Sequence, residues 1–257
     1  MTTKILGISG SPRVAGNTSH LLDVALDAAR AMDGVEVEKV SLGKLDMHGC
    51  NGCRGCDAGE FHKHEKKGRE LCVTYYRDDV DEILKKMYWA DGIIVGTPVF
   101  YQGVSAQLKM VIDRTQPLLR YSGTRYKCGL ANKVGGALVT AYNRNGGMEA
   151  TIQAIHAFMH VHDMIVVGTG IVKVDGQIVA PGCYSGACGV LWNSIGDFEK
   201  EVKSKDCVLL DELGVRSAQS LGRRVTSVAQ AISASLPSRE KLLLQEGIEP
   251  TAAIKLR

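Results

Sequence analysis

Short apolar runs alternate along the chain with segments whose apolar residues recur at helical spacing. Residues 92–96 form a continuous run without a polar side chain, which is typical of a central parallel strand buried on both faces. Residues 78–87 place apolar side chains every three or four positions and predict an amphipathic helix. The predicted strands are 4–8, 35–42, 92–96, 134–140 and 164–168, and the predicted helices are 17–29, 78–87, 105–113, 147–160 and 211–235.

This alternation of five strands with helices predicts an α/β fold with a doubly wound, five-stranded parallel sheet. We expect one domain over residues 1–236, with a cysteine-rich loop inserted at 46–78 and an irregular insertion at 170–210. Pro237 is expected to end the domain and to leave a charged C-terminal extension at 237–257. Ligands of such sheets bind at the carboxyl ends of the strands, near the point where the strand order reverses.

Composition and charge narrow the class of function. The chain has 257 residues, of which 45% are hydrophobic and 23% charged, as in ordinary globular proteins. A net charge of +3 with interspersed acidic and basic residues gives no argument for nucleic acid. No apolar run reaches the roughly eighteen residues of a membrane span, and the N-terminus lacks a signal peptide pattern. We expect a cytoplasmic protein, where eight cysteines stay reduced and favour metal or redox chemistry.

The first predicted strand leads into a loop that is rich in groups that bind anions. Hydroxyls, an amide, a guanidinium and a helix N-terminus together form an anion site. The loop lacks the Gly-Lys-Ser/Thr ending of a Walker loop and the G-x-G-x-x-G pattern of a dinucleotide loop. The alternative is a well-capped strand–helix turn that binds nothing. The candidate residues are Ser9, Ser11, Arg13, Asn17, Thr18 and Ser19.

Two further loops, at 97–103 and 140–147, are expected at the same edge of the sheet. Both are polar or glycine-rich, and their backbone N–H groups are suited to hydrogen-bond the acceptor atoms of a bound ring. Phe100 or Tyr101 is a candidate to stack on that ring, and the alternative is an ordinary core or interface aromatic.

These motifs together resemble the flavodoxin-like, NAD(P)H-dependent FMN reductase superfamily over most of residues 3–170. The resemblance rests on residues 7–13, 17–19, 90–101 and 107–114. It implies a flavodoxin-like sheet with bound FMN. The residues that it implies in FMN binding are Ser9, Ser11, Arg13, Asn17, Thr18 and Ser19 for the phosphate, and Pro98, Val99, Phe100, Tyr101, Tyr142, Asn143, Gly146 and Gly147 for the flavin ring.

A separate cluster of cysteines follows the second predicted strand. Cys50, Cys53 and Cys56 occur at every third residue, each directly after a glycine, and Cys72 comes after fifteen intervening residues. Four thiolates from one segment are sufficient to complete the coordination of a metal centre. Zinc is the leading alternative to an iron–sulfur cluster, although zinc sites favour two separated cysteine pairs. A loop that binds no metal is the other alternative.

A cysteine triplet at this place in an FMN-binding domain resembles the iron–sulfur flavoproteins. The resemblance implies a four-iron (4Fe-4S) cluster next to FMN, in oligomers whose cluster and flavin approach each other across subunits. The fourth cysteine of that family usually follows within a few residues, so the longer spacing leaves the fourth ligand open. Cys72 is our prediction, because the acidic pair Asp78 and Asp79 soon resumes the family pattern. His62 or His64 is the alternative.

These features predict an FMN-dependent oxidoreductase that passes electrons between a ferredoxin-like carrier or NAD(P)H and an acceptor. No side chain is predicted to act as a catalytic acid or base, because the cofactors supply the chemistry. One alternative is an NAD(P)H-dependent FMN or quinone reductase with a structural zinc or an empty cysteine loop. Another is a redox sensor, for which the sequence shows no output element. We expect a homodimer or homotetramer, since the insertion and the C-terminal extension exceed the needs of a five-stranded domain.

Overall fold

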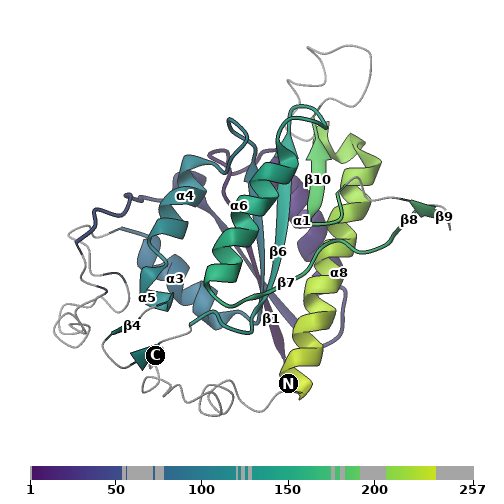
Figure 1. Ribbon diagram of the computed structural model, residues 1–257. Coiled ribbons are helices and arrows are strands. Elements are labelled where there is room, and N and C mark those ends of the chain that lie inside the picture. Colours follow the sequence, from purple (N-terminus) through teal and green to yellow (C-terminus); the bar gives the residue numbers. More distant parts are fainter. Residues whose placement is uncertain are drawn as a thin grey trace.

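The computed structural model describes most of the predicted domain. In it a parallel sheet lies between two layers of helices (Figure 1). The described residues are 2–53, 56, 72, 78–119, 121–122, 125–126, 129–174, 177–179, 183–191 and 207–235. The strands of the sheet are β1 (Thr3–Ser9), β2 (Val35–Ser41), β3 (Gly92–Pro98), β6 (Val134–Ala141), β7 (Ile165–Val166) and β10 (Ala187–Val190).

The strand order is β2-β1-β3-β6-β10, with β7 also paired to β6, and every pairing in this sheet is parallel. In register, Ile8 of β1 lies opposite Val40 of β2 and Val95 of β3. Counted along the chain this is the 2-1-3-4-5 order of flavodoxin-like folds, whose strand order reverses between the first and third strands. The predicted α/β class and flavodoxin-like sheet are therefore confirmed.

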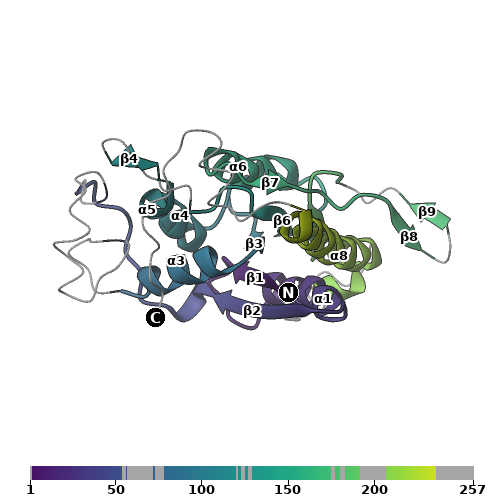
Figure 2. The same cartoon turned by 90° about the horizontal axis from the view of Figure 1, so that it is seen from below.

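Two layers of helices bury the two faces of the sheet (Figure 2). One layer is α1 (Asn17–Arg30) with α8 (Glu212–Ser235), which pack with Ile5 and Ile94 in one apolar cluster. The other layer is α3 (Val80–Trp89), α4 (Ala106–Asp113) and α6 (Met148–Val161), which pack with Ile93 and Val95 in a second cluster. Successive residues of β3 thus enter opposite cores, which is why its sequence is continuously apolar.

The fifth strand is divided, unlike the single predicted strand at 164–168. β7 pairs only with the beginning of β6, where Ile165 lies opposite Val134. The same edge of β6 is continued by β10, in which Ala187 lies opposite Leu138. The predicted insertion at 170–210 thus contains a strand of the main sheet. The four residues of β10, Ala-Cys-Gly-Val, are too few to produce a recognisable strand pattern.

Short elements lie outside the main layers. They are the 3-10 helices η1 (Leu42–Lys44) and η2 (Cys207–Leu210), the short helix α5 (Gln116–Leu119), and the antiparallel pairs β4 (Tyr121–Ser122) with β5 (Arg125–Tyr126) and β8 (Val172–Val174) with β9 (Gln177–Val179). Among the described helices, none has the length and apolar character needed to cross a membrane. The predicted extension at 237–257 and most of the loop 46–78 fall outside the described residues.

Candidate functional site

Hydrogen bonds join the loops that follow β1 and β3, and one of them reaches the end of β6. Gly10 N donates to Gly96 O (2.7 Å), and Ser105 Oγ donates to Gly10 O (2.5 Å). Val99 N donates to Thr140 O at the end of β6 (2.8 Å). These bonds fix the carboxyl ends of three neighbouring strands against one another. The switch point between β1 and β3, where such sheets bind ligands, lies among them.

Helix α1 presents its N-terminus at this edge. Its N-cap is Gly16, which has an extended backbone and no side chain to cap the helix. The first backbone hydrogen bond of the helix runs from His20 N, which donates, to Gly16 O (3.0 Å). The N–H groups of the residues before His20 therefore have no acceptor inside the helix, and they lie at the positive end of the helix dipole. Such an N-terminus is suited to bind a phosphate.

The predicted phosphate-binding side chains of the β1 loop lie in different environments. Ser9 is fully buried at the end of β1, and its Oγ has no hydrogen-bond partner among the described residues. Ser11 is also buried, and its Oγ accepts a hydrogen bond from Arg13 N (3.0 Å). The side chain of Arg13 is exposed to solvent. An unpartnered buried hydroxyl is costly, so Ser9 Oγ is a fitting donor for a bound anion.

The side chains of the predicted residues on α1 form hydrogen bonds with neighbouring elements. Thr18 Oγ1 shares a hydrogen bond with Thr140 Oγ1 (2.6 Å), which ties α1 to the end of β6. Asn17 Oδ1 accepts from Val208 N (2.9 Å) in η2. Ser19 Oγ accepts from Lys39 Nζ (2.7 Å), on β2. These three side chains already have partners, so their backbone N–H groups are the more suitable phosphate donors.

The loop after β3 presents aromatic side chains on a strained turn. Phe100 and Gly103 exchange two backbone hydrogen bonds of 3.0 Å each. The two residues between them, Tyr101 and Gln102, have φ of 48° and 60°, a left-handed conformation that costs residues with a side chain about 1 kcal/mol or more each. Tyr101 is fully exposed and Phe100 is half exposed. Exposed aromatics on strained backbone are typical of a ligand-binding loop.

The loop after β6 packs against that turn. Gly147, the N-cap of α6, has φ of 92°, and a Cβ on it would lie 2.7 Å from Gln102 Cγ. Gly146 N donates to Asn143 O (3.2 Å), and the ring of Tyr142 is 39% exposed. Pro98 and Val99, which precede the strained turn, are half-buried. The three loops thus combine an anion site with exposed rings, and this combination fits both ends of FMN.

The predicted metal ligands lie in the loop that follows η1. Cys50 and Cys53 are exposed, while Cys56 and Cys72 are partly buried, and none of them forms a disulfide. Within the described parts of the chain, no group of three or more His, Cys, Asp or Glu side chains is gathered as a metal site. The alternatives His62 and His64 lie outside the described residues. The donor set itself, four thiols from one segment, fits an iron–sulfur cluster.

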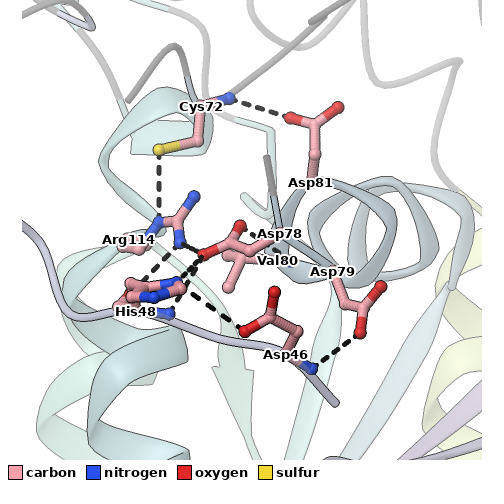
Figure 3. Close-up of polar contacts among 8 residues, drawn as sticks. All are labelled: Asp46, His48, Cys72, Asp78, Asp79, Val80, Asp81 and Arg114. Carbon is pink, nitrogen blue, oxygen red and sulfur yellow. Dashed lines mark hydrogen bonds and ion pairs between the residues drawn. The ribbon is translucent and has the colours of Figure 1, made fainter. Parts of the chain in front are cut away.

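A buried ion pair joins Arg114 to Asp78 at the end of the cysteine loop (Figure 3). Arg114, directly after α4, pairs with Asp78, and both side chains are only 1% exposed. Arg114 Nε also donates to Cys72 Sγ (3.3 Å), and its Nη1 donates to His48 O (3.1 Å). Cys72 N in turn donates to Asp81 Oδ1 (2.9 Å) in α3. One guanidinium therefore contacts both ends of the cysteine loop, at His48 and Asp78, and also Cys72 between them.

Electrostatics at this ion pair favour the charged forms. Burial alone would raise the pKa of Asp78, but hydrogen bonds from Arg114 and the His48 N–H hold that pKa below its usual value. Burial would likewise lower the pKa of Arg114, but its hydrogen bonds to Asp78 and Cys72 raise that pKa. The pair is thus ionised at neutral pH.

Sequence reasoning missed the roles of Arg114 and Asp78. Arg114 lies in the segment 107–114 that carries the family resemblance, and Asp78 belongs to the acidic pair that resumes the family pattern. The sequence pattern assigns neither residue to the site. The available signal was a charged residue adjoining an apolar helix face, which is also typical of an ordinary exposed helix end. Burial of the pair depends on contacts across 36 residues, so local pattern could not reveal it.

A second pair of cysteines lies before and at the start of β10. Cys183 and Cys188 are both buried. A hydrogen bond from the Cys188 thiol lowers the pKa of Cys183 to about 6, against the effect of burial and with help from the N–H groups of Ser185 and Gly186. The same interaction, together with burial, raises the pKa of Cys188. The interaction with Cys188 thus favours ionisation of Cys183 over ionisation of Cys188.

Comparison with known proteins gives a family and close relatives. The model of the NADPH-dependent FMN reductase family matches residues 3–178. An iron–sulfur flavoprotein of Methanocaldococcus jannaschii is 43% identical over 229 residues, which cover 89% of this chain and 98% of that protein. An iron–sulfur flavoprotein of Methanosarcina thermophila is also 43% identical, over 64% of this chain and 77% of that protein.

Solved structures share the fold at low sequence identity. The crystal structure of RosB with a bound intermediate aligns with a TM-score of 0.63 at 14% identity, over 100% of this chain and 92% of that one. A WrbA-like flavodoxin from Agrobacterium tumefaciens aligns with a TM-score of 0.52 at 15% identity, over 90% of this chain and 99% of that one. These likenesses support the flavodoxin-like architecture of the sheet.

Proposed function

The chain belongs to the NADPH-dependent FMN reductase family and, within it, to the iron–sulfur flavoproteins, and we propose that this flavin-dependent oxidoreductase passes electrons between FMN and a 4Fe-4S cluster. The observation that carries the proposal is the convergence of three loops at the switch point. These loops include the buried Ser9 hydroxyl, which has no hydrogen-bond partner among the described residues, the N-terminus of α1, and the exposed side chains of Phe100 and Tyr101. The relatives named as iron–sulfur flavoproteins support the same pair of cofactors.

In this proposal the chain binds FMN by both of its ends. The phosphate interacts with the first N–H groups of α1, with Ser9 and Ser11, and with the exposed guanidinium of Arg13. The flavin ring lies among the loops 98–101 and 142–147. Bound FMN supplies hydride or single-electron chemistry, and the loops supply orientation and N–H donors that adjust its potential.

The cluster ligands in this proposal are Cys50, Cys53, Cys56 and Cys72. Helix α4 connects the two regions, since Ser105 at its N-cap holds the loop after β1 and Arg114 beyond its end holds Cys72. An α-helix rises 1.5 Å per residue, so the eight residues of α4 span about 12 Å. The cysteine loop and the flavin loops are therefore attached to the two ends of one short helix.

The electron partners are the finer part of the proposal. NAD(P)H is one candidate donor, because the family model is that of NADPH-dependent reductases. A ferredoxin-like carrier is the other, because a cluster exchanges single electrons. We also propose that the protein acts in the cytoplasm, as a homodimer or homotetramer.

Stopped-flow reduction separates the two donors. The anaerobic protein is mixed with NADPH or with reduced ferredoxin, and the flavin and cluster absorbances are followed at separate wavelengths. We expect reduced ferredoxin to reduce the cluster first and the flavin afterwards. Rapid flavin reduction by NADPH, with an unchanged cluster, would instead favour an NAD(P)H-dependent FMN or quinone reductase in which the cysteine loop is structural.

A further inference from the structure

Arg114 joins the two ends of the cysteine loop. Its guanidinium contacts His48 O, two residues before Cys50, and Asp78, six residues after Cys72. The same ends are bound to each other directly, because His48 N donates to Asp78 Oδ2 (3.0 Å) and Asp46 N donates to Asp79 Oδ2 (2.8 Å). Figure 3 shows these contacts around the guanidinium. The base of the loop is therefore fixed even though Cys50 and Cys53 are exposed.

A further donor of this guanidinium, its Nε–H, is directed at a cysteine sulfur. Arg114 Nε lies 3.3 Å from Cys72 Sγ, within range of a hydrogen bond to sulfur. A guanidinium stays protonated at all physiological pH values. Because Asp78 balances its charge from the other side, the buried pair can persist whether or not Cys72 is ionised. The contact to sulfur is thus additional to what burial of Arg114 requires.

We propose that Arg114 is a positioning residue that holds Cys72 as the fourth ligand of the cluster and raises the reduction potential of that cluster. This inference rests on the proposed function, since it needs a cluster at the four cysteines. It assigns a task to a residue that lies outside the loops 97–103 and 140–147 in the sequence. It also gives a physical reason for the choice of Cys72 over a histidine of the same loop.

The effect on potential follows from charge and burial. Reduction adds one negative charge to a cluster, and a positive charge beside a ligand sulfur stabilises that charge. The stabilisation is larger in a buried site, where the effective dielectric constant is lower than in water. An N–H donor to a ligand atom also fixes the orientation of that ligand. Removal of the guanidinium should therefore make the cluster harder to reduce.

The test is the midpoint potential of the cluster, measured by anaerobic redox titration of the full-length protein. Arg114→Gln alone would leave Asp78 buried without its partner, which is strongly destabilising. The main variant is therefore the double substitution Arg114→Gln with Asp78→Asn, which removes both charges together. Arg114→Lys is the second variant, since it keeps a cation but lacks the planar fork. Lys109→Gln is the matched control, because it removes an exposed cation from the same helix.

The two charges that the double variant loses act in opposite directions on the cluster, so its shift reports mainly the lost N–H donor to Cys72 Sγ. We expect this variant to shift the one-electron equilibrium about tenfold toward the oxidised cluster, which is about 59 mV. Arg114→Lys should give a smaller shift in the same direction, and Lys109→Gln should give none. A wild-type midpoint in the double variant would overturn the inference. If the double variant does not retain a cluster, the midpoint potential of Arg114→Lys is the test. A wild-type midpoint in Arg114→Lys would then overturn the inference.

Iron content separates this inference from the proposed function. Cys72→Ser should lose or alter the cluster spectrum, whereas Cys207→Ser, which changes the first residue of η2, should retain it. If Cys72→Ser keeps the wild-type spectrum and midpoint, the role of Arg114 is contradicted while the cluster stands. If the wild-type protein, purified anaerobically, contains no iron and sulfide, the proposed function fails and this inference fails with it.

Discussion

At the scale of single residues, the most informative atom is the hydroxyl oxygen of Ser9. It is sealed within the protein at the end of β1 and has no hydrogen-bond partner in the described structure. Native proteins pair nearly all buried polar groups. The adjoining N-terminus of α1 provides the positive potential that an anion requires. A phosphate at this place would satisfy both groups together.

Ser9→Ala tests this assignment. Loss of an unpaired buried hydroxyl should leave the free energy of unfolding of the FMN-free protein unchanged or raise it by up to about 1 kcal/mol. Loss of one hydrogen bond to a charged phosphate should raise the Kd for FMN about tenfold, or about 1.4 kcal/mol. Fluorescence titration with FMN measures the Kd, and urea unfolding measures the stability.

The matched control is Ser217→Ala in α8. Its buried Oγ donates to Gly214 O (2.8 Å), far from the flavin loops along the chain. This variant should lose about 1 kcal/mol of stability and bind FMN as the wild type does. A wild-type Kd in Ser9→Ala would remove Ser9 from the phosphate site.

At the scale of elements, the left-handed backbone of Tyr101 and Gln102 in the loop after β3 lowers the stability of the FMN-free protein. Binding of FMN can offset this loss. Gln102→Gly should raise the stability of the FMN-free protein by about 1 kcal/mol, because glycine adopts φ of 60° without strain. It should also weaken FMN binding, because the turn that presents Tyr101 becomes more flexible. Thermal unfolding with and without FMN measures both effects.

Asn132 provides the comparison, since it has the same φ of 60° in a different loop. Asn132→Gly should give a smaller gain in stability, because asparagine tolerates this conformation better than glutamine, and it should not change FMN affinity. If Gln102→Gly binds FMN as tightly as the wild type, the strained turn has no part in the flavin site.

His162 lies directly after α6 and contacts Thr115, which lies between α4 and α5. This buried contact makes the stability of the protein depend on pH. Thr115 Oγ1 donates to Ile112 O (2.7 Å), so it accepts from His162 Nε2 (2.8 Å), and the buried Nδ1 has no partner in the described structure. Burial lowers the pKa of His162 to about 4, partly countered by Asp163. His162 therefore binds a proton more tightly in the unfolded chain than in the folded protein. The stability that comes from burying the neutral imidazole is complete above about pH 6.5 and is lost as pH falls toward 4.

We expect His162 to account for a loss of about 3 kcal/mol in the free energy of unfolding between pH 7 and pH 4. Urea unfolding at a series of pH values measures it. His162→Gln keeps a donor for Thr115 but has no proton to gain, so its stability should fall less steeply. Parallel pH profiles for the two proteins would refute the buried neutral histidine.

Sequence pattern predicted most of the fold because buried parallel strands are apolar throughout. It did not predict the division of the fifth strand, since four residues of β10 provide no periodicity. For the site, the pattern identified the loops at the carboxyl edge. It could not show that the side chain of Asn17 accepts a hydrogen bond from η2 and that of Ser19 one from β2, because those contacts depend on tertiary structure.

At the scale of the whole molecule, the β8–β9 hairpin stands away from the two helical layers (Figures 1 and 2). Isolated two-stranded hairpins are marginally stable in water. Ile171, directly before β8, and Ile178, within β9, are 68% and 71% exposed. A surface of this kind is typical of an interface, and a second copy of the chain is the occupant expected from the proposed homodimer or homotetramer.

Ile178→Lys should therefore dissociate the oligomer without unfolding the chain. Sedimentation velocity at micromolar concentration measures the mass, and circular dichroism checks the fold. Ile171→Val, which keeps an apolar side chain, should leave the assembly intact. A wild-type protein that sediments as a monomer would contradict the proposed oligomer.

The central claim is that this chain holds FMN and an iron–sulfur cluster together. Anaerobic purification followed by analysis of iron, acid-labile sulfide, zinc and flavin tests it most directly. We expect about four iron and four sulfide per chain, about one FMN, and a broad iron–sulfur absorbance beneath the flavin peaks. Stoichiometric zinc without iron or sulfide would contradict it.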